Sequence, residues 1–226
     1  MEKIGLLTLG IIIANGLFSY KGFSDRLFFE DNLFQVNKIL QGKEYKRLIT
    51  SGFLHADWTH LIFNMVSFYS FSDMLESHLG PVKFLIIYFG SLLGGDMLAL
   101  IIHQKHPYYR AVGASGAVCG IIFAAIALFP DIHIGFIFIP LKDGIPGWIF
   151  GIGYALYTIY GIKSNMGNIG HEAHLGGALV GLALAVAIEP EALERNLQPI
   201  ILTAAPSLIF IIILIIKPEI LLGRKN

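Results

Sequence analysis

Residues 113–130 read GASGAVCGIIFAAIALFP, and the apolar part of this stretch is too short to cross a lipid bilayer. The residues from Ser115 to Phe129 would form a helix of ~22 Å, whereas a hydrocarbon core is ~30 Å thick. The Ser115 end would therefore stop below one membrane surface, where its backbone must face protein or a wet cavity. This length predicts a serine, and water, at membrane depth.

The rest of the chain indicates a lipid environment. Hydrophobic residues make up 55% of the 226 residues and charged residues only 14%, with a mean hydropathy of +0.68. Further apolar runs cover Ile4–Tyr20, Leu54–Met74, Val82–His103, Ile145–Ile162, His174–Ile188 and Pro199–Ile216. We therefore predict an all-α fold, a single polytopic membrane helix bundle over residues 1–226 with seven spans. The helix at 199–216 is set apart from the others by Pro190.

The segment at residues 21–51 mixes apolar and charged side chains, which suits a loop lying at the membrane interface. If the first helix begins in the cytoplasm, the cations of this loop lie outside, and the positive-inside rule favours the reverse. Both orientations stay open, because acidic residues alternate with these cations. The net charge is zero, so nothing indicates a nucleic-acid partner. The sequence carries no signal for the oligomeric state.

Polar groups within spans are costly in lipid, so each is a candidate for function. They form three clusters: His55, His60 and Asn64 in the second span, Gly113–Gly116 in the fourth, and His171–His174 in the sixth. At a helix start, Ser115 has unpaired backbone N–H groups suited to a developing oxyanion. The alternative is that Ser115 is simply a helix N-cap.

Small residues at four-residue spacing predict which helices touch. They are Gly116 and Gly120 in the fourth span, and Gly177 and Gly181 in the sixth. Such faces let two membrane helices approach closely. In a serpentine bundle these two spans run parallel, so Ser115 and His174 would meet at the same end. A neutral imidazole there can take the proton of a serine hydroxyl.

His60 and Asn64 are four residues apart and share a helix face. Two readings of this pair are open. The side chains can donate hydrogen bonds to a tetrahedral intermediate beside the Ser115 N–H, or they can stabilise the bundle by hydrogen bonding between helices.

Three motifs, in this order, resemble the rhomboid intramembrane serine proteases. They are HADWTHLIFN at residues 55–64, GASG at 113–116 and AHLGG at 173–177 with Gly181, within a core at about residues 44–189. The resemblance implies a six-helix core, with the helix at 199–216 as an extra C-terminal span. It also implies a Ser115–His174 dyad acting through an acyl-enzyme, and an oxyanion site of His60, Asn64 and the Ser115 N–H. The supporting residues would be His55, Gly113, Gly116, Gly177, Gly181 and Cys119.

The same resemblance implies partners and a location. Substrates would be transmembrane segments of other proteins, cut within the lipid bilayer without a cofactor. The chain would be a multi-pass integral membrane protein, in the plasma membrane if it is bacterial. Apart from the resemblance, we hypothesise from the residues themselves that the loop at 163–170, rich in small residues, and the fifth helix, with Trp148 and Phe150, gate substrate entry from lipid.

The sequence departs from the family pattern at two core positions. The first loop reads EYKR at residues 44–47, which keeps Arg47 but lacks the tryptophan that often precedes it. Cys119 stands where an aromatic residue often packs on the catalytic histidine, so the His174 ring needs another support.

Other functions fit the sequence less well. The histidines of His171-Glu172-Ala173-His174 are three residues apart, whereas the zinc-protease motif needs four, so no metal site is predicted. His171 is expected at the surface or behind the site. A proton-coupled transporter would need buried carboxylates, and Asp96 is the only plausible one, for which solvation or a helix-end bond is expected. A non-catalytic relative that binds or escorts membrane proteins is the remaining alternative.

Overall fold

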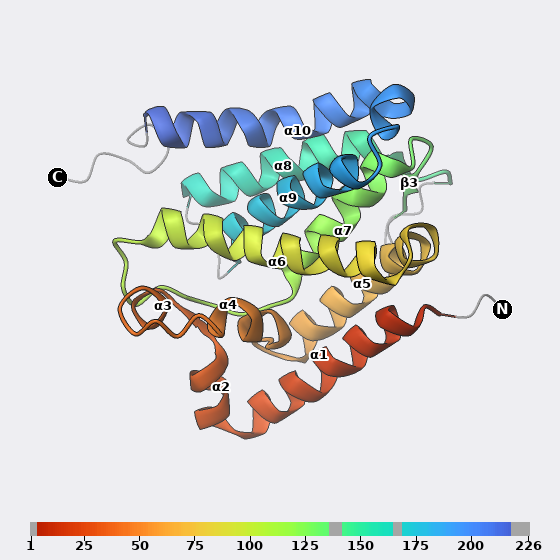
Figure 1. The fold of residues 1–226 in the computed structure, drawn as a ribbon. Helices are drawn as coiled ribbons and strands as arrows, with labels where there is room; N and C mark the ends of the chain where they lie inside the picture. The colour runs from red at the N-terminus through yellow and green to blue at the C-terminus, as the bar shows by residue number, and fades with distance from the viewer. Residues whose placement is uncertain (1–3, 136–141, 165–168, 218–226) are drawn as a thin grey trace.

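The structure is a computed structural model that describes residues 4–135, 142–164 and 169–217. It is a helical bundle, and a helix overlaps each of the seven predicted spans (Figure 1). The long helices are α1 (Leu6–Ser24), α5 (Trp58–Leu79), α6 (Pro81–His103), α7 (Ser115–Leu128), α8 (Gly147–Ser164), α9 (His171–Ile188) and α10 (Ala192–Ile216). By length and composition, α1, α6, α9 and α10 can each cross a membrane, and α7 is a shorter apolar helix. The predicted all-α membrane bundle is confirmed.

The centre of the bundle is α7, the shortest of these helices. It packs against α5, α6 and α9, and nearly all of its residues are buried. In Figure 1, α10 lies along α8 on one side of the bundle, and α1 lies beside α5 on the opposite side. The short helix predicted from residues 113–130 therefore stands within protein along almost its whole length.

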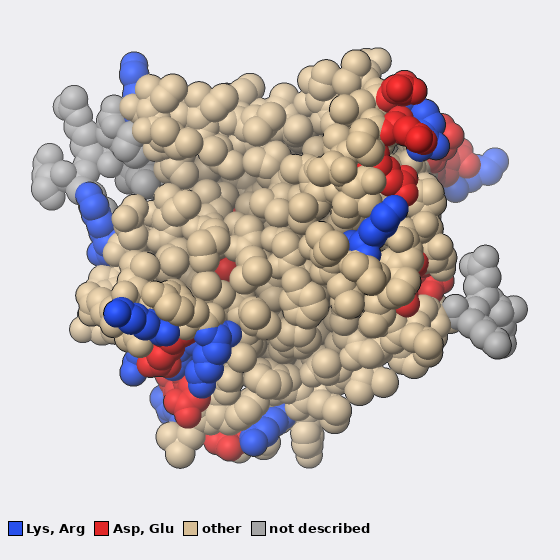
Figure 2. Space-filling view, in the orientation of Figure 1, with Lys and Arg blue, Asp and Glu red and all other residues tan. Residues whose placement is uncertain are grey.

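Charged side chains lie toward the edges of the molecule. In Figure 2 they gather mainly over α2 (Arg26–Asn32), α3 (Val36–Leu40) and α4 (Arg47–Thr50), and at the opposite edge near the start of α10. On the face that Figure 2 shows, the surface between these groups is almost free of charge. Large apolar side chains are exposed on the bundle, among them Leu17, Ile62, Ile101, Tyr160 and Ile215. This arrangement fits a bilayer around the middle of the bundle.

The first loop is folded rather than irregular. Besides α2, α3 and α4 it contains β1 (Phe34–Gln35) and the 3₁₀ helix η1 (Ser51–Phe53), and β1 pairs antiparallel with β2 (Arg110–Ala111). The Arg47 guanidinium is 2% exposed and donates to the carbonyl oxygens of Glu30 and Leu33, each at 2.8 Å. It also holds the Glu44 carboxylate at 2.7 Å, and this hydrogen bond lowers the pKa of Glu44. Arg47 thus anchors the loop without the missing tryptophan.

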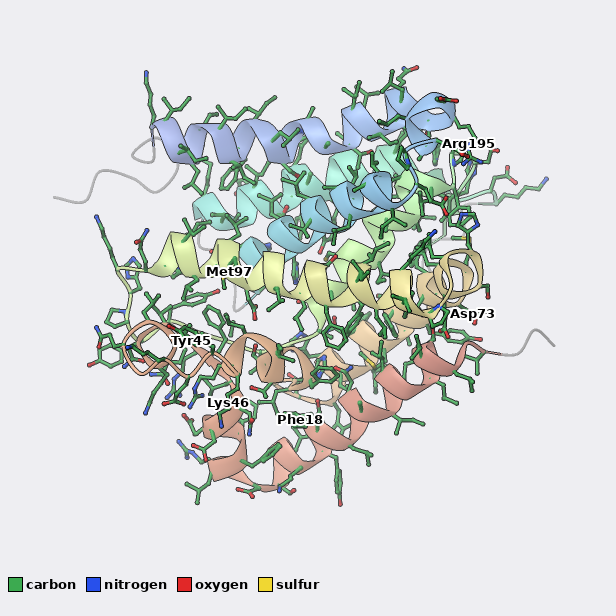
Figure 3. All side chains as sticks on the ribbon, in the orientation of Figure 1. Phe18, Tyr45, Lys46, Asp73, Met97 and Arg195 are labelled. Atoms are coloured by element: carbon green, nitrogen blue, oxygen red, sulfur yellow. The ribbon has the colours of Figure 1, made fainter. Side chains whose placement is uncertain are left out.

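Side chains of α5 cap the start of α1. The residue at the cap position of α1 supplies no capping side chain. Asp73 Oδ1 accepts from the Gly5 N–H at 2.6 Å, and the Glu76 carboxylate accepts from the backbone N–H groups of Leu7 and Thr8. Figure 3 shows Asp73 near the end of α5 that faces the start of α1. These bonds satisfy N–H groups that a helix start leaves unpaired.

Most helix boundaries differ from the predicted spans by a few residues, and two of these differences bear on the site and its surroundings. Residues 54–57 form the turn before α5, so His55 precedes that helix rather than lying in it. Helix α10 begins at Ala192, earlier than the predicted 199, but non-helical dihedral angles at Asn196 (φ −139°) kink it, so the long apolar part that carries Pro199 starts just after Asn196. The Asn196 side chain donates to the carbonyl oxygens of Ile126 at 2.8 Å and Ala127 at 3.1 Å, near the end of α7. A further small ribbon, β3 (His133–Ile134) with β4 (Ile145–Pro146), lies beyond α7.

Candidate active site

Ser115 is the first residue of α7 and is not its N-cap. Ala114 occupies the cap position, and its methyl side chain cannot cap the helix. The backbone N–H groups of the first turn therefore lie at the Ser115 end without an acceptor from a capping side chain. Ser115 itself is half-buried. The capping alternative for Ser115 is wrong, and its hydroxyl stays available for other partners.

The glycine faces of α7 and α9 meet, and the two helices run parallel. A methyl group on Gly116 would lie 3.2 Å from the Ala173 carbonyl oxygen, and one on Gly177 would collide with the Gly116 carbonyl. Further along, a methyl group on Gly181 would collide with the Gly120 backbone. The two backbones are thus in direct contact, which places Ser115-Gly116 alongside Ala173-His174.

Gly113 makes room for His60 beside Ser115. Its φ of +132° lies in a region that residues with a side chain rarely adopt. A Cβ atom at Gly113 would lie 2.9 Å from His60 Nε2 and 3.7 Å from Ser115 Oγ. His60 Nε2 and Ser115 Oγ therefore border the same small space, the one that a side chain at Gly113 would fill. The Ala56 N–H points at His60 Nδ1 at 3.4 Å. This contact leaves the proton on Nε2, the nitrogen that faces Gly113.

Asn64 lies one helical turn after His60 and is buried. Its side-chain N–H donates to the His60 carbonyl oxygen at 3.0 Å. This bond lies within α5 and does not join two helices. One amide N–H of Asn64 is therefore engaged, and the second remains for another acceptor.

His55 is fully buried and links three segments of the chain. Its Nδ1 contacts Ser19 Oγ of α1 at 2.9 Å, while Nε2 accepts from the Ala114 N–H at 3.4 Å. Its ring meets the His60 ring edge-on, with centroids 5.0 Å apart. His55 therefore positions the residue before Ser115 and supports His60, a geometry that suits a structural role.

The support of His174 comes from a residue that the sequence analysis did not single out. The Tyr154 hydroxyl of α8 lies 3.0 Å from His174 Nδ1 and 3.0 Å from Cys119 Sγ. The Tyr154 ring stacks on the His174 ring, with centroids 6.2 Å apart and planes 23° apart. The available signal was a tyrosine inside an apolar span, where its hydroxyl needs a partner.

His171 is not a surface residue, so that part of the expectation is wrong. It is 2% exposed, and its ring lies 5.3 Å from Tyr157 and 6.1 Å from His174. The absence of a side chain at Gly161 makes room for the His171 ring. The close packing of α8 on the start of α9 buries this histidine, and sequence spacing alone does not reveal that contact.

Two buried carboxylates lie near the site with partners of their own. Glu172 accepts from His103 at 2.8 Å, and the Tyr109 ring stacks on the His103 ring at 3.6 Å. Burial, followed by the Glu172 charge, raises the pKa of Tyr109. Asp96 lies 3.4 Å from the Ser51 hydroxyl in the interior of α6. The expectation of a solvated or helix-end Asp96 is wrong, because α6 continues past it and the loop covers it.

Comparison with known proteins identifies the family. The family model for the Rhomboid domain matches residues 42–190, close to the core predicted at 44–189. The chain belongs to the rhomboid family. RHOMBOID-like protein 12, mitochondrial, of Arabidopsis thaliana is 31% identical over 77% of this chain and 56% of its own length. Rhomboid protein 1, mitochondrial, of Saccharomyces cerevisiae is 28% identical over 67% of this chain and 45% of its own length.

A bacterial relative also matches. The Putative rhomboid protease YdcA of Bacillus subtilis is 35% identical over 48% of this chain and 55% of its own length. The chain thus spans about half the length of these three relatives. Membership of the rhomboid family and the apolar helices together establish that the chain is an integral membrane protein. The relatives' names include mitochondrial, chloroplastic and bacterial proteins, so they give no support to a plasma-membrane location in particular.

Proposed function

We propose that this rhomboid-family chain is an intramembrane serine endopeptidase that cuts transmembrane segments of other proteins. Ser115 is the nucleophile and His174 is the base. The observation that carries the proposal is the backbone contact between α7 and α9, which places Ser115-Gly116 beside Ala173-His174. Relatives whose names include rhomboid protease support the same class of activity.

The proposed reaction begins when His174 Nε2 takes the Ser115 hydroxyl proton and Oγ attacks the scissile carbonyl carbon. The resulting oxyanion accepts from the Ser115 N–H, the His60 Nε2–H and the second Asn64 N–H. When the tetrahedral intermediate collapses, the C–N bond breaks and His174 gives its proton to the leaving amine. Water, deprotonated by His174, then attacks the acyl-enzyme and releases Ser115.

The test is cleavage of a tagged transmembrane reporter co-expressed with each variant. Ser115→Ala and His174→Ala are expected to abolish cleavage. Ser70→Ala and His133→Ala are matched controls at exposed positions of α5 and β3, and both are expected to cleave normally. Persistent cleavage by either dyad variant would refute the dyad. Binding of the reporter by wild type without any cleavage would instead support the escort alternative.

Substrate entry belongs to the same proposal. Helix α8 packs mainly against α10 and α9, whereas α5 packs mainly against α7 and α1. We therefore place the entrance from lipid between α5 and α8, with the half-buried Trp148 on α8. Phe150 stacks on Tyr154 at 5.6 Å, so it belongs to the support of His174 as well. The loop hypothesis rests on residues 163–170, of which 165–168 lie outside the described residues.

A cross-link tests the entrance. In a Cys119→Ser background, one cysteine on α5 and one on α8 would be joined by a bifunctional reagent. Joining the helices is expected to stop cleavage of the membrane reporter, while the same protein before cross-linking stays active. Unimpaired cleavage after cross-linking would place the entrance elsewhere.

A further inference from the structure

Three helices meet at the Tyr154 hydroxyl. It comes from α8, His174 Nδ1 comes from α9, and Cys119 Sγ comes from α7, with both contacts at 3.0 Å. The Phe150 ring stacks on the Tyr154 ring, with centroids 5.6 Å apart and planes 19° apart. The Tyr154 ring is therefore near-parallel both to Phe150 and to the His174 ring of the proposed base.

The protonation state of His174 determines which atom donates in the hydrogen bond between His174 Nδ1 and the Tyr154 hydroxyl. A histidine that takes a proton through Nε2 must carry its own proton on Nδ1. The His174 Nδ1–H then donates to the Tyr154 oxygen, and the Tyr154 O–H donates to Cys119 Sγ, a weak acceptor. If Tyr154 donated to Nδ1 instead, the proton would sit on Nε2 and His174 could not act as a base.

We propose that Tyr154 is a positioning residue for His174, and that the Cys119 thiol holds its hydroxyl in place. This proposal rests on the proposed function and deepens it. The hydroxyl contact, with the Tyr154 ring near-parallel to the imidazole, orients the His174 ring, and the hydroxyl selects its tautomer. Once His174 has taken the serine proton, the bond becomes charge-assisted and stronger. Tyr154 thus does from α8 what an aromatic residue at position 119 of α7 would do.

The arrangement couples chemistry to α8. Because Tyr154 is carried by the helix that borders the proposed entrance, displacement of α8 would remove the partner of Nδ1. The base is then correctly oriented only when α8 is docked on α9. A substrate segment must therefore be admitted before α8 returns and cleavage begins.

The experiment compares wild type, Tyr154→Phe and Tyr160→Phe, purified and reconstituted in liposomes. Tyr154→Phe keeps the stacked ring and loses only the hydroxyl, and Tyr160 is an exposed tyrosine on the same helix. Two rates are measured: reaction of Ser115 with a fluorophosphonate probe, and cleavage of a transmembrane peptide at several concentrations. We expect Tyr154→Phe to lower kcat and the labelling rate about 10- to 100-fold with KM unchanged. Tyr160→Phe is expected to match wild type.

Cys119 supplies a second, independent pair of variants. Cys119→Ser keeps a partner for the Tyr154 hydroxyl, whereas Cys119→Ala removes it. We expect near wild-type labelling for the serine variant and about threefold slower labelling for the alanine variant. If Tyr154→Phe does not fold, the two Cys119 variants test the proposal instead. Equal labelling rates for Cys119→Ser and Cys119→Ala would overturn it.

The two proposals fail in different ways. If wild type is not labelled at Ser115 and cuts no peptide, the proposed function fails and the role of Tyr154 fails with it. If wild type is labelled and Tyr154→Phe is labelled equally fast with the same kcat, only the positioning role is overturned. A raised KM with unchanged kcat would also overturn it, because that result indicates a role in substrate binding.

Discussion

The α7–α9 contact and the α8–α10 contact hold their helices together in different ways. Between α7 and α9, backbone meets backbone, and a methyl group on Gly177 or Gly181 would enter the facing chain. Between α8 and α10, side chains intervene: Gly151 receives the Thr203 side chain, and Phe210 and Leu214 pack in a cluster with Ala155. At these glycines the first contact has no side chain that can adjust, whereas the second contact is made by several side chains.

The difference separates two tasks of the proposed site. The spacing between Ser115 and His174 depends on two backbones in contact, which rotamer changes cannot alter. The direction of the His174 ring depends on Tyr154, carried by the helix with adjustable packing. The rigid α7–α9 pair thus sets the distance between Ser115 and His174, and α8, which packs adjustably on α10, sets the orientation of the His174 ring.

Breaking the α7–α9 contact is expected to have the largest effect. Gly181→Ala would force the two backbones apart, at a cost of about 1–3 kcal/mol in folding stability. We expect loss of both thermal stability and Ser115 labelling. The matched control is Gly153→Ala on α8, where no atom lies within 4 Å of the added methyl group. That variant should be as stable as wild type or slightly more stable, because alanine favours helix.

These two glycine variants are compared by thermal unfolding in detergent and by labelling rate. The comparison fails if Gly181→Ala unfolds at the wild-type temperature, or if Gly153→Ala loses as much stability as Gly181→Ala.

Loosening the anchor of α10 is expected to have an intermediate effect. Asn196→Ala removes two hydrogen bonds to the end of α7 and leaves the carbonyls of Ile126 and Ala127 without this donor. We expect a loss of about 1–2 kcal/mol in stability, with Ser115 labelling retained because α7 and α9 stay in contact. Gln198→Ala, at an exposed position of α10, is the control and should change neither quantity. Loss of labelling in folded Asn196→Ala would show that α10 also sets the Ser115–His174 geometry.

Removing one hydroxyl from the α8–α10 contact is expected to have the smallest effect. Among the described residues, the buried Thr203 Oγ1 has no hydrogen-bond partner. Thr203→Val keeps the shape and should leave stability unchanged or raise it by up to about 1 kcal/mol. Thr158 is the matched control on α8, since its buried hydroxyl donates to the Ala155 carbonyl at 2.8 Å. Thr158→Val should therefore destabilise by about 1 kcal/mol, and equal unfolding temperatures for both variants would contradict the comparison.

Much of the bundle could be predicted from local patterns. Apolar runs located the seven long helices, and Pro130 marked the early end of α7. The four-residue spacing of Gly116 with Gly120, and of Gly177 with Gly181, predicted which helices touch. These signals are local because helix length and face depend on residues close in sequence. The helical turn from Ala192 and the kink at Asn196 were not predicted, and the Asn196 side chain makes its hydrogen bonds to the distant end of α7.

What the sequence determines by itself is a membrane bundle with a short central helix and polar residues at one end of it. Lipid penalises each polar group in a span, so composition and spacing are enough for that conclusion. Only the tertiary structure decided that Ala114 and not Ser115 occupies the cap position, that His171 is buried, and that Tyr154 supports His174. The last two depend on side chains far apart in the chain, which the packing of α8 on α9 brings together.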